Sequence, residues 1–241
     1  MQADPSDLAP QAESLFGIRL SAKQVEQFSR FEALLLDYNA RFNLTAIRDV
    51  ASIRTRHFLD SLSLLQVLPA SGALRVVDVG TGAGFPGLPL KIMLPALHLT
   101  LVESIGKKAN FCQLVVEELG LADVQVLNTR AEELARQPEH REGYDYALAR
   151  AVAAMPILAE YLLPLVKVSG KMVAQKGSSA HVEAQSAARA FNLLGASLER
   201  VIPVELPGVS DERYLVVVRK TSPTPTAYPR PAGAPVKKPL T

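Results

Sequence analysis

The chain has 241 residues, of which 48% are hydrophobic and 21% charged, and its formal net charge is +2. This length and composition suit one domain of ordinary size with a large core, and they exclude a disordered or fibrous chain. No apolar run is long enough for a membrane span, no signal-peptide pattern opens the chain, and the single Cys112 cannot form an internal disulfide. We therefore expect a cytoplasmic protein.

Residues 1–72 predict an N-terminal helical extension. Ser21 and Gln24 fit a capping box, and apolar residues recur at helical spacing over residues 21–40. Asp49 is placed to cap a second helix that reaches about residue 68. His57 and Asp60 share one face of that helix, where a polar surface near a domain seam is favoured over a substrate contact.

A glycine-rich turn follows the first predicted strand. Val76, Val77 and Val79 form an apolar, β-branched run typical of a buried parallel strand. Four glycines then fall within eight residues, and an apolar helical pattern continues to Pro95. Strand, turn and helix form the first unit of a nucleotide-binding α/β fold, in which a ligand lies over the helix N-terminus.

The glycine pattern alone does not identify the ligand. Residues 82–87 fit the dinucleotide pattern G-x-G-x-x-G, which is a weak signal. However, a carboxylate at Asp78 repels a pyrophosphate and suits a ligand with an ammonium group. Gly80 and Gly82 also begin the glycine series earlier, which resembles the first motif of S-adenosylmethionine-dependent methyltransferases. A nicotinamide or flavin site and a turn without a ligand stay open as alternatives.

Six further strands are predicted, and together they favour a methyltransferase sheet. The last two are joined by a short loop at Pro207 and Gly208 and predict an antiparallel hairpin, with which methyltransferase sheets end and dinucleotide sheets usually do not. We therefore expect residues 73–220 to form an α/β domain with a mostly parallel seven-stranded sheet. The six strands are expected at residues 97–102, 124–127, 144–149, 170–177, 198–204 and 213–219.

Polar residues at the strand ends are candidates for ligand contacts. Glu103 ends the second strand, where an acid accepts hydrogen bonds from ribose hydroxyls, although a charge at a helix N-terminus is the alternative. Ala131 and Glu132 follow the third strand and are placed to meet an adenine. Arg150 ends the fourth strand, where it can grip a carboxylate or phosphate or form a structural ion pair.

Residues 221–241 hold six prolines and no acid. This segment cannot form an internal helix or a central strand, so we expect an extended basic arm that is ordered on its partner. Five cations and no acid follow residue 218, which favours a local contact with nucleic acid as much as a solvated tail. These cations are Arg219, Lys220, Arg230, Lys237 and Lys238.

The methyl acceptor is constrained by residues that the sequence lacks. Methylation of an exocyclic base amine usually uses an Asp/Asn-Pro-Pro-aromatic turn after the fourth strand, where this chain has residues 149–152 as Ala-Arg-Ala-Val. Methylation of cytosine C5 needs a thiolate, and Cys112 falls inside a predicted helix. Ring nitrogen N7 of guanine needs neither a nucleophile nor a strong base. We assign no catalytic base and no metal, and a small-molecule acceptor stays open.

Several motifs together resemble the bacterial 16S ribosomal RNA guanine-N7 methyltransferases, the glucose-inhibited division protein B family, over roughly residues 20–241. They are the segments 42–47, 57–62, 78–87, 103–108, 130–133, 149–151 and 228–240. The resemblance implies a Rossmann-like fold and methylation of guanine 527, in the 530 loop of 16S RNA.

The resemblance also implies the site residues and the partners. It places cofactor contacts on Gly80, Phe85, Ala131, Glu132 and Arg150, with Phe85 standing where relatives often have Leu. The implied cofactor is S-adenosylmethionine and the implied partner is the small ribosomal subunit, and we expect a monomer. A methyltransferase for a small metabolite and a non-catalytic nucleotide-binding regulator are the competing hypotheses.

Overall fold

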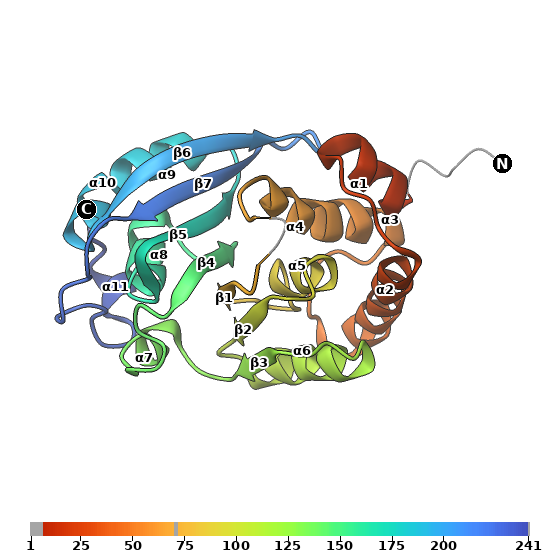
Figure 1. Ribbon diagram of the computed structural model, residues 1–241, viewed down its shortest axis with the longest axis horizontal. Helices are drawn as coiled ribbons and strands as arrows, with labels where there is room; N and C mark the ends of the chain where they lie inside the picture. The colour runs from red at the N-terminus through yellow and green to blue at the C-terminus, as the bar shows by residue number, and fades with distance from the viewer. Residues whose placement is uncertain (1–6, 70–71, 241) are drawn as a thin grey trace.

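The computed structural model describes residues 7–69 and 72–240, and one seven-stranded sheet runs through it with helices on both faces (Figure 1). The strand order is β3-β2-β1-β4-β5-β7-β6. The strands are β1 (Arg75–Val79), β2 (His98–Val102), β3 (Val124–Leu127), β4 (Tyr144–Arg150), β5 (Val166–Lys176), β6 (Ala196–Val204) and β7 (Arg213–Lys220). This is the sheet that the sequence predicts, with boundaries shifted by a few residues.

Strand β1 lies at the centre of the sheet and positions the glycine turn. It pairs in parallel with β2 and β4, so that Val77 lies between Thr100 and Ala147. Strand β7 is antiparallel to both β5 and β6, which confirms the predicted terminal hairpin. The chain order reverses between β1 and β4, and the carboxyl ends of the strands at such a point form the usual ligand crevice of an open α/β sheet.

The N-terminal helices and two crossover helices cover one face of the sheet (Figure 1). They are α1 (Leu8–Phe16), α2 (Ala22–Phe42), α5 (Gly87–Met93) and α6 (Gly106–Glu118). The predicted capping box at Ser21 and Gln24 is present. Phe28 and Phe31 of α2 pack on Phe58 with ring centroids 5.1 and 5.5 Å apart, so the aromatic stripe of this helix contributes to the core. Residues 70–71, near the end of the predicted N-terminal extension, lie outside the described residues.

The second predicted helix exists, but it is not a regular α-helix. It consists of α3 (Val50–Ile53), a π-helical turn η1 (Arg54–Leu59), α4 (Asp60–Leu62) and a 3₁₀ turn η2 (Ser63–Gln66). Asp49 caps its start, as predicted, because its Oδ1 accepts the Ser52 N–H at 2.8 Å. A π turn changes the angular position of every residue beyond it, and such turns are frequent at functional sites.

Short helices cover the opposite face of the sheet. They are α7 (Ala131–Leu134), α8 (Met155–Leu162), α9 (Ala180–Ser186) and α10 (Ala188–Leu193). The sequence predicts one helix over residues 180–194, whereas the structure divides it at the buried Ala187. In the two described ranges, no helix combines the length and apolar character that crossing a bilayer requires.

The C-terminal arm, residues 221–240, packs on the body of the protein, and the expectation of an arm ordered only on its partner is wrong for this conformation. Arg141 donates hydrogen bonds to the carbonyl oxygens of Thr224 and Tyr228, both at 2.8 Å. Arg230 pairs with Glu160 of α8 at 2.5 Å, and this carboxylate is fully buried. Prolines leave carbonyl oxygens without a neighbouring N–H donor, and arginines of the body supply donors instead.

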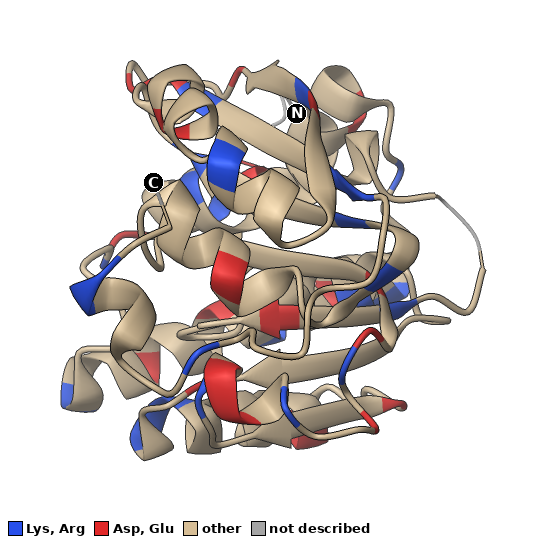
Figure 2. Cartoon of the chain, turned by 90° about the vertical axis from the view of Figure 1, so that its left-hand side faces the viewer, with Lys and Arg blue, Asp and Glu red and all other residues tan. Residues whose placement is uncertain are grey.

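A short helix α11 (Ala234–Lys237) ends the arm beside α8. On the side of the molecule that carries the arm, basic and acidic residues are interspersed rather than segregated (Figure 2). Arg230 is paired with Glu160. The exposed cations of the described part of the arm are therefore Lys237 and Lys238. The arm therefore offers fewer free charges than its composition indicates.

Candidate functional site

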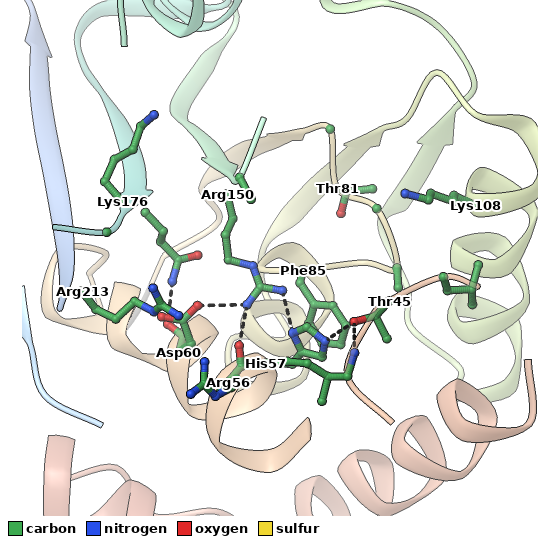
Figure 3. A pocket seen from close by; sticks show the side chains of 18 residues that line it. Thr45, Arg56, His57, Asp60, Thr81, Phe85, Lys108, Arg150, Lys176 and Arg213 are labelled. Carbon is green, nitrogen blue, oxygen red and sulfur yellow. Dashed lines mark hydrogen bonds and ion pairs between the residues drawn. The ribbon is translucent and has the colours of Figure 1, made fainter. Parts of the chain in front are cut away.

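A cavity of about 460 Å³ opens at the carboxyl ends of β1, β4 and β5 (Figure 3). This volume lies within the range of roughly 300–1,000 Å³ that is typical of small-ligand sites. It is lined by residues 44, 45 and 47 before α3, by 56, 57 and 60 of the second helix, by 80–83 and 85 of the glycine turn, by Lys108, by 150 and 151, by 175–177 and by Arg213. Among these described residues five are Lys or Arg and one, Asp60, is an acid, and the acids Asp211 and Glu183 beside the lining pair with Arg56 and Lys176.

The glycine turn forms one wall of the cavity. The Gly80 N–H donates to the Val102 carbonyl oxygen at 2.8 Å, which continues the pairing of β1 with β2 into the turn. Gly80 and Gly82 have φ of +68° and +63°, a region that favours glycine. A Cβ at Gly80 would stand 2.7 Å from Val152, whereas a Cβ at Gly82 would meet no atom within 4 Å. The open space that a ligand needs is therefore at Gly82 rather than at Gly80.

Arg150 connects the sheet to the second helix. Its Nη1 donates to Asp60 Oδ2 at 3.0 Å and to the Arg56 carbonyl oxygen at 3.1 Å, and its Nη2 donates to His57 Nδ1 at 3.1 Å. The guanidinium also lies 5.0 Å from the centre of the Phe85 ring. The sequence left a ligand grip and a structural ion pair open for Arg150, and the structure shows the ion pair at the wall of the cavity.

His57 is held as a neutral imidazole between Arg150 and Thr45. Its ring stacks on Phe85 with centroids 4.5 Å apart, and its Nε2 lies 2.8 Å from Thr45 Oγ1. Burial, and then the charge of Arg150, lower the pKa of His57 to about 3. A guanidinium only donates hydrogen bonds, so Nδ1 must accept and the ring hydrogen must be on Nε2. His57 therefore has no free lone pair with which to accept a proton.

Asp78 does not line the cavity, although the sequence places it toward a ligand ammonium group. It is fully buried, and its Oδ2 accepts hydrogen bonds from Thr81 Oγ1 at 2.6 Å and from the Gly87 N–H at 2.8 Å. Burial raises its pKa to about 6. Asp78 thus supports the turn and the start of α5 from below. This position does not agree with the expected direct contact between Asp78 and a ligand ammonium group.

Glu103 also supports the turn. Its Oε2 accepts the Gly82 N–H at 3.0 Å and its Oε1 accepts the Ile105 N–H at 2.8 Å. The side chain is buried and does not line the main cavity. The carboxylate lies at the N-terminus of α6, which was the alternative interpretation, and the ribose contact stays a prediction.

Ala131 and Glu132 lie at the start of α7, beyond the lining of the main cavity. Both are buried, and Glu132 Oε1 accepts the N–H of Gly233 from the C-terminal arm at 3.1 Å. The contact of these two residues with an adenine stays a prediction. The hydrogen bond from Gly233 holds the C-terminal arm beside Glu132.

The structure brings Gly80, Gly82, Phe85 and Arg150 together, and it adds residues that sequence reasoning missed. Thr45, Arg56 and Arg213 were not predicted, and His57 and Asp60 were interpreted as a polar face near a domain seam. The spacing of His57 and Asp60 on one helix face was the signal available for them. Nothing in the local pattern of Arg213, at the start of β7, indicates that it reaches the same cavity.

Two solved structures of similar fold are those of methyltransferases. A methyltransferase described as S-adenosylmethionine-dependent, from Aquifex aeolicus, aligns with a TM-score of 0.54 at 17% identity over 73% of this chain and 96% of its own. Geranyl diphosphate C-methyltransferase from Streptomyces coelicolor aligns with the same score at 14% identity over 68% and 79%. At these identities the likeness shows the fold.

Sequence relatives are much closer. A ribosomal RNA small subunit methyltransferase G from Roseiflexus castenholzii is 51% identical over 93% of this chain and 95% of its own. One from Desulforamulus reducens is 42% identical over 92% of each chain. The family model GidB, described as rRNA small subunit methyltransferase G, matches residues 24–210. The chain belongs to this family of S-adenosylmethionine-dependent methyltransferases.

Proposed function

We propose that this protein methylates N7 of one guanine in 16S ribosomal RNA, position 527 in the usual numbering of that RNA. The membership of the family and the names of the relatives support ribosomal RNA of the small subunit as the substrate. The observation that supports N7 as the acceptor concerns the ionisable side chains of the cavity, His57 and Asp60, neither of which is free to act as a base. Its imidazole is neutral with its lone pair engaged by Arg150, and its one carboxylate, among the described lining residues, is paired with the same arginine.

An acceptor that loses a proton would need a base in this cavity, and an acceptor with a free lone pair does not. Guanine N7 has such a lone pair, and methyl transfer to it releases no proton. When bound, S-adenosylmethionine supplies an electrophilic methyl carbon attached to a sulfonium. The work of the protein is then to align the base with that carbon and to exclude water.

The residues present fit the cofactor at the glycine turn. The space in front of Gly82 is free of protein atoms, and the backbone there can approach a ligand closely. We infer that Gly80, Gly82, Phe85 and Arg150 form the wall of its site. Ala131, Glu132 and Glu103, at the ends of the neighbouring strands, are the proposed contacts for its adenosine part, and Asp78 acts by supporting the turn.

The basic rim supports an RNA substrate. Lys108 lies across the cavity from Lys176 and Arg213 (Figure 3). Arg56 and Arg213 lie 3.0 and 3.8 Å from Asp211, and Lys176 lies 2.7 Å from Glu183. Cations at the mouth of a base-sized cavity suit the phosphates that flank an extruded nucleotide. We also infer that the protein acts as a monomer in the cytoplasm, where its substrate is assembled.

The test is to incubate the protein with S-adenosylmethionine labelled in its methyl group and with small ribosomal subunits that lack this methylation. Cleavage at 7-methylguanosine should then map the label to guanine 527. Subunits with adenine at this position are the matched control and should receive no label there. Label in a low-mass fraction with unlabelled RNA would instead identify a small-molecule acceptor, and label at another nucleotide would refute the proposed position.

A further inference from the structure

Thr45 lines the cavity, and its hydrogen bonds use both acceptor positions of its hydroxyl oxygen. It stands between α2 and α3, half-buried, and it lines the cavity (Figure 3). Its backbone is fixed because its N–H donates to Asn39 Oδ1 at 2.9 Å. Its hydroxyl therefore has a defined position at the wall.

The direction of each hydrogen bond at Thr45 follows from Arg150. Because Arg150 Nη2 donates to His57 Nδ1, the ring hydrogen of His57 is on Nε2 and is donated to Thr45 Oγ1 at 2.8 Å. The Ile47 N–H also donates to Thr45 Oγ1, at 3.2 Å. A hydroxyl oxygen has two lone pairs, and both are now used. The hydroxyl hydrogen has no acceptor among the described residues, and the cavity is the space beside it.

A methyltransferase that targets guanine N7 has a specific problem of selection. Adenine also has an unshared pair on N7, so N7 alone does not distinguish the two purines. The neighbouring position of the same base edge does: guanine has the acceptor O6, whereas adenine has an amino group, which is a donor. A fixed hydroxyl donor beside the base would attract O6 and oppose the amino group, while leaving N7 free for the methyl carbon.

We propose that Thr45 donates its hydroxyl hydrogen to O6 of the target guanine and is thereby a specificity-determining residue. This inference rests on the proposed function. His57, Arg150 and Asp60 then have a common purpose, because together they force the hydroxyl of Thr45 to donate. In this scheme His57 is a positioning residue that acts through Thr45.

The experiment combines a change in the enzyme with a change in the base. Thr45→Val removes the hydroxyl at similar size, and Thr45→Ser keeps it. The substrates are small subunits reconstituted with ligated 16S RNA that contains guanine or 2-aminopurine at position 527. 2-Aminopurine keeps N7 and the 2-amino group but lacks O6.

The quantity measured is kcat/KM for each pair of enzyme and base. With guanine, Thr45→Val should lower kcat/KM about 10- to 100-fold, the usual effect of losing one base-reading hydrogen bond. The wild type should lose a similar factor with 2-aminopurine, Thr45→Val should lose little more, and Thr45→Ser should keep most of the guanine activity. The KM for S-adenosylmethionine should stay the same in all cases.

Two outcomes separate the failure of this inference from that of the proposed function. If Thr45→Val lowers kcat/KM by the same factor with both bases, Thr45 only supports the local structure and the contact with O6 is refuted. If the wild type methylates no guanine of 16S RNA, the proposed function is itself wrong.

Discussion

Arg150 and Asp60 join the end of the fourth strand to the second helix through an ion pair of 3.0 Å in which the side chains are only 16% and 7% exposed. Arg150 also donates to the Arg56 carbonyl oxygen and to His57, so the pair is part of a buried network rather than a surface contact. Breaking a buried pair by removing one partner leaves a charge without compensation.

We expect Asp60→Ala to lower the free energy of unfolding by about 3 kcal/mol, because the guanidinium of Arg150 stays buried without its carboxylate. The matched control is Asp211→Ala. It removes the partner of Arg56, which is far more exposed than Asp60, and it should cost about 1 kcal/mol or less. Urea unfolding of the two variants measures the difference. Equal effects would show that burial of the Arg150 pair has no energetic consequence.

Gly82 and Gly208 provide a second matched comparison. They have φ of +63° and +65°, and in neither case would an added Cβ meet an atom within 4 Å. An alanine at either position should therefore cost about 1–2 kcal/mol of stability from backbone strain. Only Gly82 lines the cavity, so only Gly82→Ala should weaken S-adenosylmethionine binding, by at least tenfold in calorimetry. Unchanged affinity in folded Gly82→Ala would argue against the cofactor position.

The buried Asp78 predicts an unusual dependence of stability on pH. Its pKa is raised to about 6, so the folded state holds the proton more tightly than the unfolded state does. The stabilising contribution of this group is present below its ordinary pKa of 3.8 and is lost as the pH rises through 6.

Replacing Asp78 with Asn should remove this dependence. Relative to the wild type, Asp78→Asn should gain about 2 to 2.5 kcal/mol of unfolding free energy between pH 4 and pH 7.5, from the size of the shift. Chemical denaturation at the two pH values measures it. A difference between the two proteins that is the same at both pH values would contradict the raised pKa.

His57 predicts a rate that does not depend on the protonation of an imidazole. Its pKa is lowered to about 3, so it is neutral throughout the working range. Single-turnover methyl transfer at saturating cofactor should be level between pH 6 and 8.5, with no inflection near the ordinary histidine pKa of 6.5. An inflection there that disappears in His57→Asn would identify His57 as a base and remove the main support for N7.

The pair of Arg230 and Glu160 predicts how the C-terminal arm is held. Glu160 is fully buried and accepts hydrogen bonds from the side chain and the backbone N–H of Arg230. Arg230→Met should cost about 3 kcal/mol and speed the hydrogen exchange of residues 228–240, while Lys238→Met, at an exposed position, should do neither. Arm protection that is unchanged in Arg230→Met would mean that other contacts hold it.

The sequence predicted most of the fold because its signals are local. The glycine turn, the capping box at Ser21 and the cap at Asp49 each depend on residues a few positions apart, and the structure confirms all three. The terminal hairpin followed from a short loop between two β-branched runs. Helix α1 and the break at Ala187 carry no comparable local signal.

The local sequence pattern predicted the lining of the cavity at the ends of the strands, and the family resemblance added Phe85. Gly80 and Arg150 stand at the ends of strands, and such positions meet at one edge in any parallel sheet. Thr45, Asp60 and Arg213 reach the same cavity from segments far apart in the chain, and their convergence depends on how the N-terminal helices pack. Asp78 and Glu103 were predicted to lie near the glycine turn, and both do. Sequence alone does not tell whether such a carboxylate faces a ligand or the backbone of the turn.

The π-helical turn from Arg54 to Leu59 has a consequence for how chain length can vary in this family. A π turn holds about one residue more than an α turn does, so the six residues of this segment rotate the chain about as far as five α-helical residues would. One residue can therefore be lost here while the positions of Asp49 and Asp60 keep their relative orientation, provided that the segment becomes α-helical. We therefore expect homologous chains that have a regular α-helix here to have one residue fewer between these two positions, and those that keep the π turn to have the same number.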